Sequence, residues 1–167
     1  MESLQETYRA AMRGLASTVC VVAAGTPHGP RGMTATALMS LSVEPPTLAV
    51  AINRAASLNR ALAPGASLTI HLLTERHGEL AKAFAGGLPP HQRFAVGDWR
   101  FEADGEPLLA DASAGFSCRV DQRLETSTHS LIIARVLAVR QSSGVRPLLY
   151  ANGDFTRLRE PAPRPAA

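Results

Sequence analysis

The sequence predicts a mainly β protein, an antiparallel β-barrel with a few short helices packed on its outside. Seven or eight short segments have the composition or the alternation of β-strands, and most of them follow one another at hairpin spacing. No strand–helix–strand unit repeats, which argues against a doubly wound parallel sheet. The chain has 167 residues, 46% of them hydrophobic and 19% charged, so it is long enough to bury one core without disulfides or metals.

The first two elements are a helix and a strand. A short amphipathic helix is predicted over residues 2–13, ending at Gly14, because its apolar residues recur at helical spacing. Residues 17–24 are rich in β-branched side chains and predict a strand, which ends at the Gly- and Pro-rich turn of residues 25–30.

Three strands and two helices are expected in the middle of the chain. Residues 31–42 would form barrel strand and stop before a Pro-Pro pair, and residues 47–52 are a continuous apolar run of strand length. A short helix is expected next, starting at residue 55 or 57 and ending at residue 62. Residues 67–73 alternate polar and apolar side chains, which predicts a half-buried strand before a helix at residues 75–84.

The second half is predicted to be mostly strand. The Gly- and Pro-rich loop of residues 85–97 is long enough that we expect a lid or a partner contact there. A weak strand is expected to open at Phe101 and stop at Pro107. Residues 112–120 alternate, and residues 129–139 give the strongest strand signal in the chain.

The predicted fold ends in two short strands and a tail. A hairpin-like return at residues 142–144 leads to strands at residues 148–151 and 155–158, separated by a glycine turn. We expect one domain over residues 1–160 and a disordered Pro-rich tail over residues 161–167.

Charge and cysteine content exclude several classes of protein. Seventeen Lys and Arg residues against fourteen Asp and Glu give a net charge of +3, and no basic run is present, so we expect no nucleic-acid partner and only a weak preference for anionic ligands. No apolar window approaches the ~20 residues of a membrane span and no signal peptide is recognisable, so we expect a cytoplasmic protein without a membrane partner. Cys20 and Cys118 are expected to be free, buried thiols.

Common catalytic and binding motifs are missing from the sequence. It contains no GxGxxG, GxxxxGK[ST], HExxH or GxSxG pattern, which removes the usual support for Rossmann, P-loop, zincin and hydrolase chemistry. The five histidines include no i, i+4 pair, so we expect no metal site.

The most informative segment is residues 31–46, RGMTATALMSLSVEPP, because small and hydroxyl residues occupy a place where a barrel strand is usually bulky. Small side chains at residues 34–37 would let backbone N–H and C=O groups approach the edge of a flat heteroaromatic ligand, and Ser40 and Ser42 could donate to phosphate or ribityl oxygens. The alternative is a small-residue strand packed tightly against a helix. The residues alone leave both interpretations open.

This segment resembles the signature of the short-chain flavin reductases, the reductase components of two-component flavin-dependent monooxygenases. That signature is approximately G-M-T-A-x-A/S-F-x-S-V-S-x-x-P-P, and Leu38 and Leu41 are conservative departures from it. The resemblance extends over residues 8–158. The matching signature positions are Gly32, Met33, Thr34, Ala35, Ala37, Ser40, Ser42, Pro45 and Pro46.

The resemblance implies a split β-barrel, normally a homodimer, that binds FMN or FAD and reduces it with NADH or NADPH. The reduced flavin would be supplied to a partner monooxygenase. The resemblance implies that Ser40 and Leu41 contact the ribityl or phosphate region, and that Ala55 and Ser57 lie near the phosphate. Phe84 would be a further flavin contact. The positions implied to lie along the isoalloxazine are Thr34, Ala35, Thr36, Ala37 and Leu38.

The nicotinamide side of the site is also implied by the resemblance. His129 resembles the family histidine that lies against the nicotinamide, and it is our candidate catalytic residue, although Ser127 and Thr128 replace the usual Gly-Asp before it. Ala134 replaces a strand glycine of the family. The residues implied to close over the nicotinamide are Tyr150, Gly153 and Phe155.

Arg54 is a candidate on physical grounds alone, because its guanidinium would stand just before a helix start and could pair with a phosphate. A solvated surface position is the alternative. Two other functions stay open: a flavoprotein of the same fold that retains its flavin and acts on another acceptor, and a non-catalytic flavin carrier. The choices between FMN and FAD and between NADH and NADPH are not made by the sequence.

Overall fold

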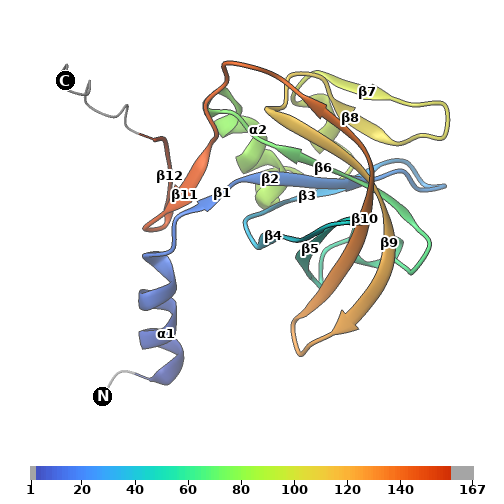
Figure 1. Ribbon diagram of the computed structural model, residues 1–167. Helices are drawn as coiled ribbons and strands as arrows, with labels where there is room; N and C mark the ends of the chain where they lie inside the picture. Colours follow the sequence, from blue (N-terminus) through green and yellow to red (C-terminus); the bar gives the residue numbers. More distant parts are fainter. Residues whose placement is uncertain (1–2, 159–167) are drawn as a thin grey trace, which may run out of the picture.

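The computed structural model describes residues 3–158, so the predicted tail at residues 161–167 lies outside the described residues. Its main element is an antiparallel sheet of seven strands, in the order β3–β2–β6–β9–β10–β5–β4 (Figure 1). The strands are β2 (Cys20–Ala24), β3 (Arg31–Ala35), β4 (Leu38–Val43), β5 (Pro46–Asn53), β6 (Ser67–Leu72), β9 (Ala114–Glu125) and β10 (His129–Gln141).

This sheet is an open barrel whose gap lies between β3 and β4. These two strands are the edges of the sheet, yet only Thr36 and Ala37 separate them in the chain, so the sheet must curl until its edges approach each other. They are not paired with each other in the sheet. The prediction of a mainly β, antiparallel fold with short helices is confirmed, and the barrel is split rather than closed.

Two smaller sheets flank the barrel. β1 (Ser17–Thr18), β11 (Leu149–Ala151) and β12 (Asp154–Thr156) form one, in the order β1–β11–β12, and β7 (Trp99–Phe101) pairs with β8 (Pro107–Leu109) in the other.

The strand predicted over residues 17–24 therefore breaks at Val19. The Val19 N–H donates to the carbonyl of Leu148 at 2.9 Å, and its carbonyl accepts from the N–H of Leu73 at 2.9 Å. The chain thus passes from one sheet to the other at this residue.

Two strand predictions in the second half need correction. The segment at Phe101 ends a strand instead of opening one, because a turn closed by the hydrogen bond from Glu102 N–H to Glu106 C=O joins β7 to β8. The hairpin-like return at residues 142–144 is wrong, since β11 pairs with β1 and β12 and not with β10. The half-buried strand at residues 67–73 is also wrong in its burial: the polar face of β6 is covered as completely as its apolar face.

The helices are short. α1 (Leu4–Arg13) has a capping box between Ser3 and Glu6, as good helix starts do. The predicted helix at 75–84 is a succession of a 3-10 turn (Glu75–His77), α2 (Gly78–Lys82) and a π-turn (Ala83–Gly87). The predicted helix at 55–62 shrinks to a 3-10 turn (Asn59–Ala61). A further 3-10 turn, Arg93–Ala95, lies in the 85–97 loop.

Two apolar clusters stabilise this arrangement. One fills the barrel interior with side chains from β2, β5, β6, β9 and β10, and the other packs α2 and its π-turn against the outer face of β2. Cys20 and Cys118 belong to the first cluster as free thiols, as predicted, and burial raises the pKa of each to about 12.

α1 extends away from the barrel (Figure 1) and has no buried side chain. Its apolar residues Leu4, Tyr8 and Met12 are 83%, 62% and 44% exposed. None of the helices within residues 3–158 is long and apolar enough to cross a membrane.

Candidate functional site

A surface hollow of about 460 Å³ lies where β3, the turn after β5 and the π-turn after α2 meet. Four of the residues implied by the resemblance, Thr34, Ala55, Ser57 and Phe84, come together here from three distant parts of the chain. The full lining is Met33, Thr34, Asn53, Ala55, Ala56, Ser57, Phe84, Ala85, Gly86, Pro90 and Arg93.

The small residues of β3 pack against the helical segment and line the hollow at the same time. A Cβ on Gly32 would lie 2.8 Å from an edge carbon of the Phe84 ring, so glycine is what allows β3 to approach that ring. The Thr34 hydroxyl donates to the carbonyl of Ala81 at 2.7 Å. The alternative of a small-residue strand packed against a helix is thus confirmed for these residues, and Thr34 still faces the hollow.

The two strands at the gap of the barrel are each paired with one other strand only. β3 pairs with β2 alone and β4 with β5 alone, so alternate N–H and C=O groups of both strands face the gap. Between them, the Ala37 carbonyl accepts from the N–H of Ala51 at 3.0 Å. Residues 34–38 therefore lie at this gap, and of them Thr34 lines the hollow.

Ser40 and Leu41 lie farther along β4 and do not line the hollow. Both are exposed, and a bulge separates the pairing of Ser40 from that of Ser42. Ala35, the last residue of β3, is buried, and its carbonyl accepts from the Cys20 thiol at 3.2 Å.

The turn after β5 is held by a buried polar network that the sequence analysis missed. Asn59 is 3% exposed, and its amide donates to the carbonyl of Ile52 at 3.1 Å and to the Ser130 hydroxyl at 2.9 Å. The Arg123 guanidinium donates to the Asn59 side-chain oxygen at 2.6 Å and to its backbone carbonyl at 2.7 Å. This network fixes the segment that carries Ala55 and Ser57.

Glu125 completes the network at the surface. Hydrogen bonds from Arg123 and then Ser130 hold the pKa of its carboxyl below the usual value. Arg54 joins here: its Nε lies 3.5 Å from Glu125 Oε2, and its Nη1 donates to the carbonyl of Thr126 at 3.2 Å. Arg54 is therefore directed to the β9–β10 turn and does not line the hollow.

Arg93 is the cation that does line the hollow, and it was not among the predicted residues. Its Nη1 donates to the carbonyl of Gly32 at 2.9 Å and its Nε to the carbonyl of Leu88 at 3.0 Å, so its guanidinium is held against β3. Burial lowers its pKa from the usual value. No local pattern distinguishes it from fifteen other arginines.

The nicotinamide candidates do not line the hollow, although His129 lies next to it. His129 lies opposite Asn53 in the β5–β10 ladder, one position beyond the lining, and its Nδ1 is 2.9 Å from the Thr128 hydroxyl. Tyr150, Gly153 and Phe155 lie in or beside β11 and β12. The rings of Tyr150 and Phe155 contact each other at 5.6 Å, and none of the three lines the hollow.

A model of the flavin reductase like domain family matches residues 12–159. This chain belongs to that family. The matched range contains β3, the turn after β5, Phe84 and the β11–β12 turn, so the resemblance drawn from the residues is confirmed over nearly the whole chain.

Several named flavin reductases are similar to this family member over most of their own length. The FMN reductase (NADH) RutF 2 of Methylorubrum extorquens is 42% identical over 154 residues, 92% of this chain and 90% of the relative. The FMN reductase (NADH) RutF of Variovorax paradoxus is 35% identical over 92% of this chain and 86% of its own. The NADH:FAD oxidoreductase SgcE6 of Streptomyces globisporus, solved with NAD and FAD fragments, has a TM-score of 0.85, 25% identity and 95% coverage of both chains.

In this flavin reductase family member a second hollow, of about 520 Å³, adjoins the first through Ser57, which lines both. Its other walls include His28 and the two cations Arg31 and Arg60. The two hollows therefore give a long ligand an aromatic end at Phe84, where Arg93 is the one cation in the lining, and a second end beyond Ser57 with Arg31 and Arg60.

Proposed function

We propose that this protein is an NADH-dependent flavin reductase that accepts FMN in the hollow at Phe84 and Ser57. In the reaction, a hydride passes from the nicotinamide to the flavin ring and one proton is taken from solvent, so NADH becomes NAD⁺ and the flavin is reduced. The observation that carries the proposal is the assembly of Thr34, Ala55, Ser57 and Phe84 into one hollow in a chain of this family. FMN and NADH are favoured because the relatives at 42% and 35% identity carry those names.

The protein's share of this reaction is binding and orientation, since both reacting atoms belong to the substrates. We assign the flavin ring to the gap beside residues 34–38, where one-sided backbone N–H groups can stabilise charge that develops on the reduced ring. The phosphate end extends past Ala55 and Ser57 toward Arg31 and Arg60. Ser40 and Leu41 stay assigned to the ribityl side of the gap.

We assign the nicotinamide to the side of the hollow that His129 borders. His129 is half-buried and directly opposite Asn53, which lines the hollow. Replacing His129 with Ala should raise the apparent KM for NADH severalfold while the Kd for FMN stays unchanged. His91→Ala, at an exposed loop histidine, is the matched control, and an unchanged KM for NADH in His129→Ala would remove His129 from the site.

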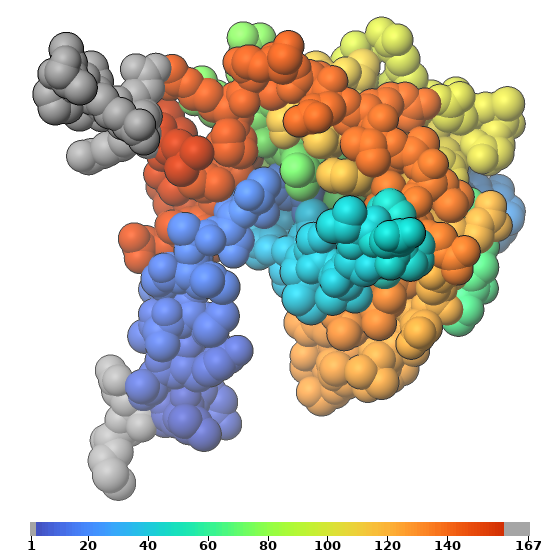
Figure 2. All heavy atoms as spheres, in the orientation of Figure 1, coloured from blue at the N-terminus to red at the C-terminus, as the bar shows by residue number. Residues whose placement is uncertain are grey.

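We further propose that the working form is a homodimer. α1 is a well-capped helix whose apolar residues are all exposed in the described part of the chain. Met39, Leu137 and Val139 expose a second apolar surface on β4 and β10. Figure 2 shows these two strands, in cyan and orange, on one face of the molecule. The Asn152 N–H donates to the carbonyl of Arg13, so the turn with Tyr150, Gly153 and Phe155 is tied to α1 and would reach a nicotinamide as part of that interface.

Light scattering tests the dimer directly. Tyr8→Glu, on the apolar stripe of α1, should give a monomer, whereas Arg9→Glu should leave a dimer. A wild-type protein that is monomeric at micromolar concentration, or a Tyr8→Glu variant that stays dimeric, would contradict the role given to α1.

We propose that reduced flavin leaves for a partner monooxygenase, because the hollow is open at the surface: Ala55, Ser57, Ala85 and Gly86 are all exposed. The test is to mix the protein with FMN or FAD and to follow the absorbance of NADH and NADPH. Multiple turnovers of added FMN with NADH are expected. Tightly retained flavin with little turnover would favour the flavoprotein alternative, and no oxidation with either flavin would reject the reductase in favour of a carrier.

A further inference from the structure

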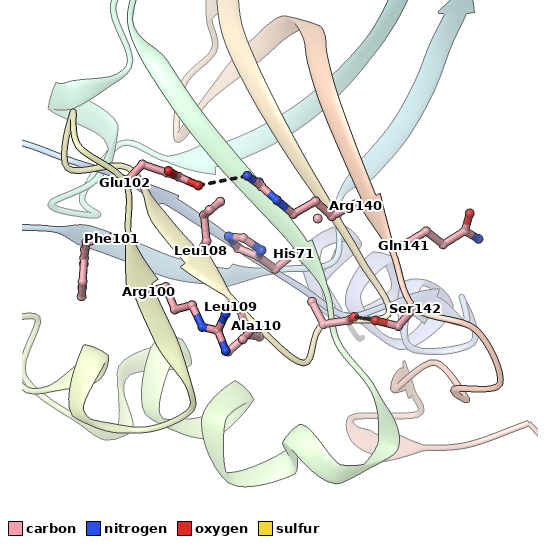
Figure 3. Close-up of a pocket in the computed structure, with 12 residues that line it drawn as sticks. His71, Arg100, Phe101, Glu102, Leu108, Leu109, Ala110, Arg140, Gln141 and Ser142 are labelled. Carbon is pink, nitrogen blue, oxygen red and sulfur yellow. Dashed lines mark hydrogen bonds and ion pairs between the residues drawn. The ribbon is translucent and has the colours of Figure 1, made fainter.

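A separate cavity of about 400 Å³ lies on the outer side of the barrel, between the β7–β8 hairpin and the sheet (Figure 3). It shares no lining residue with the two hollows described above. Its floor is a row across three neighbouring strands: His71 on β6 lies opposite Gly115 on β9, which lies opposite Arg140 on β10. Figure 3 shows the His71 ring between the hairpin residue Leu108 and the Arg140 side chain.

His71 presents an unused hydrogen-bond acceptor to this cavity. The side chain is 1% exposed, and its Nε2 lies 3.2 Å from the carbonyl of Pro107. A carbonyl only accepts, so Nε2 carries the hydrogen and Nδ1 is the ring nitrogen with the lone pair. Nδ1 has no hydrogen-bond partner, which is costly for a buried polar atom.

The ring is neutral at physiological pH. Burial, and to a smaller extent the charge of Arg140, lowers the pKa of His71 to about 4, although its hydrogen bond to Pro107 acts in the opposite direction. A partner for Nδ1 must therefore be a donor, an O–H or N–H group, rather than an anion.

Gly115 keeps a side chain away from His71 Nδ1. A Cβ built on Gly115 would lie 3.3 Å from this nitrogen, which is closer than most Cβ contacts. The backbone of Gly115 is not in the left-handed region, so the glycine is not required by its conformation, and its effect here is that β9 places no side chain beside Nδ1.

The rest of the cavity combines apolar walls with a cationic rim. Leu108, Leu109 and Ala112 supply the walls next to His71. Arg140 stands at the rim, 58% exposed, in an ion pair with Glu102 at 3.0 Å, and Arg100 is 75% exposed with only a 4.0 Å contact to Asp98. Among the residues that line the cavity, Glu102 is one carboxylate against two guanidinium groups, since Asp98 lies outside the lining.

We propose that this cavity is a second binding site, for a small aromatic carboxylic acid that carries a hydroxyl or N–H group at the end opposite its carboxylate. The donor group would reach His71 Nδ1 in the space beside Gly115, the ring would lie against Leu108 and Leu109, and the carboxylate would meet Arg100 and Arg140. The site does not depend on the flavin proposal, since none of its residues lines the flavin hollow.

The experiment titrates 4-hydroxybenzoate into the protein by calorimetry, and compares benzoate, which lacks the donor, with 4-hydroxybenzyl alcohol, which lacks the carboxylate. Trp99 is the single tryptophan of the chain and its ring lies 5.3 Å from that of His71, so its fluorescence reports the same site without any enzymatic activity. We expect 4-hydroxybenzoate to bind at least about tenfold more tightly than either analogue, the value of one well-made hydrogen bond.

Two variants locate the binding. Gly115→Ala fills the space beside Nδ1 with a methyl group and should abolish the preference for the hydroxyl, and Arg140→Gln should weaken both acids but not the alcohol. Gly78→Ala, which meets no atom within 4 Å, is the matched control, and FMN binding should be unchanged in all three variants. No binding of 4-hydroxybenzoate at millimolar concentration, binding unchanged in Gly115→Ala, or displacement of the acid by FMN would each overturn the assignment.

Discussion

Gly32→Ala tests whether the close approach of β3 to Phe84 builds the flavin hollow. The added Cβ would lie 2.8 Å and 3.1 Å from two carbons of the Phe84 ring and 3.1 Å from a carbon of Phe94. Phe84 is 1% exposed and contacts Phe94 and Trp99 at 5.0 Å and 5.4 Å between ring centroids. The ring therefore has no free direction, and β3 or the whole aromatic group must shift.

Overpacking of this kind costs roughly 1–3 kcal/mol. At roughly 2–4 °C per kcal/mol for a chain of this size, the Tm should fall by several degrees, and the urea midpoint should fall with an unchanged m-value. Because Phe84 lines the hollow, the Kd for FMN, measured by quenching of flavin fluorescence, should rise severalfold as well.

The matched control is Gly78→Ala at the first residue of α2, where a Cβ meets nothing and the φ of −57° is helical. It should be neutral or stabilise the protein by roughly 0.5–1 kcal/mol, because alanine is the better helix former. If Gly32→Ala has the stability of the wild type to within about 0.5 kcal/mol, β3 is not held against Phe84 as described and the reasoning fails.

Three further predictions concern buried or charged groups. His71 has a folded-state pKa of about 4 against 6.5 when unfolded, so the unfolded state binds the extra proton first as the pH falls. The free energy of unfolding that depends on the neutral ring is therefore complete above pH 6.5 and decreases by up to about 3 kcal/mol on approaching pH 4. Urea titrations should show a flatter acid profile for His71→Leu than for the wild type. Asn59→Ala leaves Ser130 and Arg123 without their buried partner, so it should lower the free energy of unfolding by roughly 1–3 kcal/mol and raise the Kd for FMN. Arg119→Ala, at an exposed position, is its control. An unchanged urea midpoint in Asn59→Ala would contradict the network. Arg93→Ala should weaken FMN binding clearly, whereas Arg54→Ala should change the Kd less than twofold, as expected for an exposed ion pair; equal effects of the two would show that the assignment of the hollow's cation is wrong.

The strands could be predicted because their evidence is local. The β-branched or apolar runs of β2, β5 and β10 are recognisable without knowing what covers them. The break at Val19 could not be predicted, since it depends on hydrogen bonds of Val19 with Leu148 and Leu73, which lie far from it in the sequence. The signature segment predicted one strand over residues 31–42, but the structure has two, β3 and β4, separated at Thr36 and Ala37. Of this segment, Met33 and Thr34 line the hollow.

The direction of a long side chain could not be predicted in the same way. Arg54 precedes the turn that carries Ala55 and Ser57, yet its partners, Glu125 and Thr126, come from a hairpin about seventy residues later. Arg93 lies in a loop with no periodic pattern, and its place in the hollow depends on the carbonyls of Gly32 and Leu88. The direction of each guanidinium group depends on tertiary contacts, which the neighbouring residues in the sequence do not reveal.

The polar face of β6 is the place where local pattern and structure differ most, and the difference has a chemical consequence. Alternation of Ser67, Thr69 and His71 with apolar residues is typical of a strand with one face in water, but the β7–β8 hairpin covers that face and the Pro107 carbonyl accepts from Thr69 at 2.7 Å and from His71. The hairpin satisfies the Thr69 hydroxyl and one ring nitrogen of His71 and leaves the other beside Gly115 without a partner. A core position selected only for stability would carry an apolar side chain there. The hydrogen bond to Pro107 accounts for one ring nitrogen of His71, and the ligand proposed for the cavity would supply the donor that the other lacks.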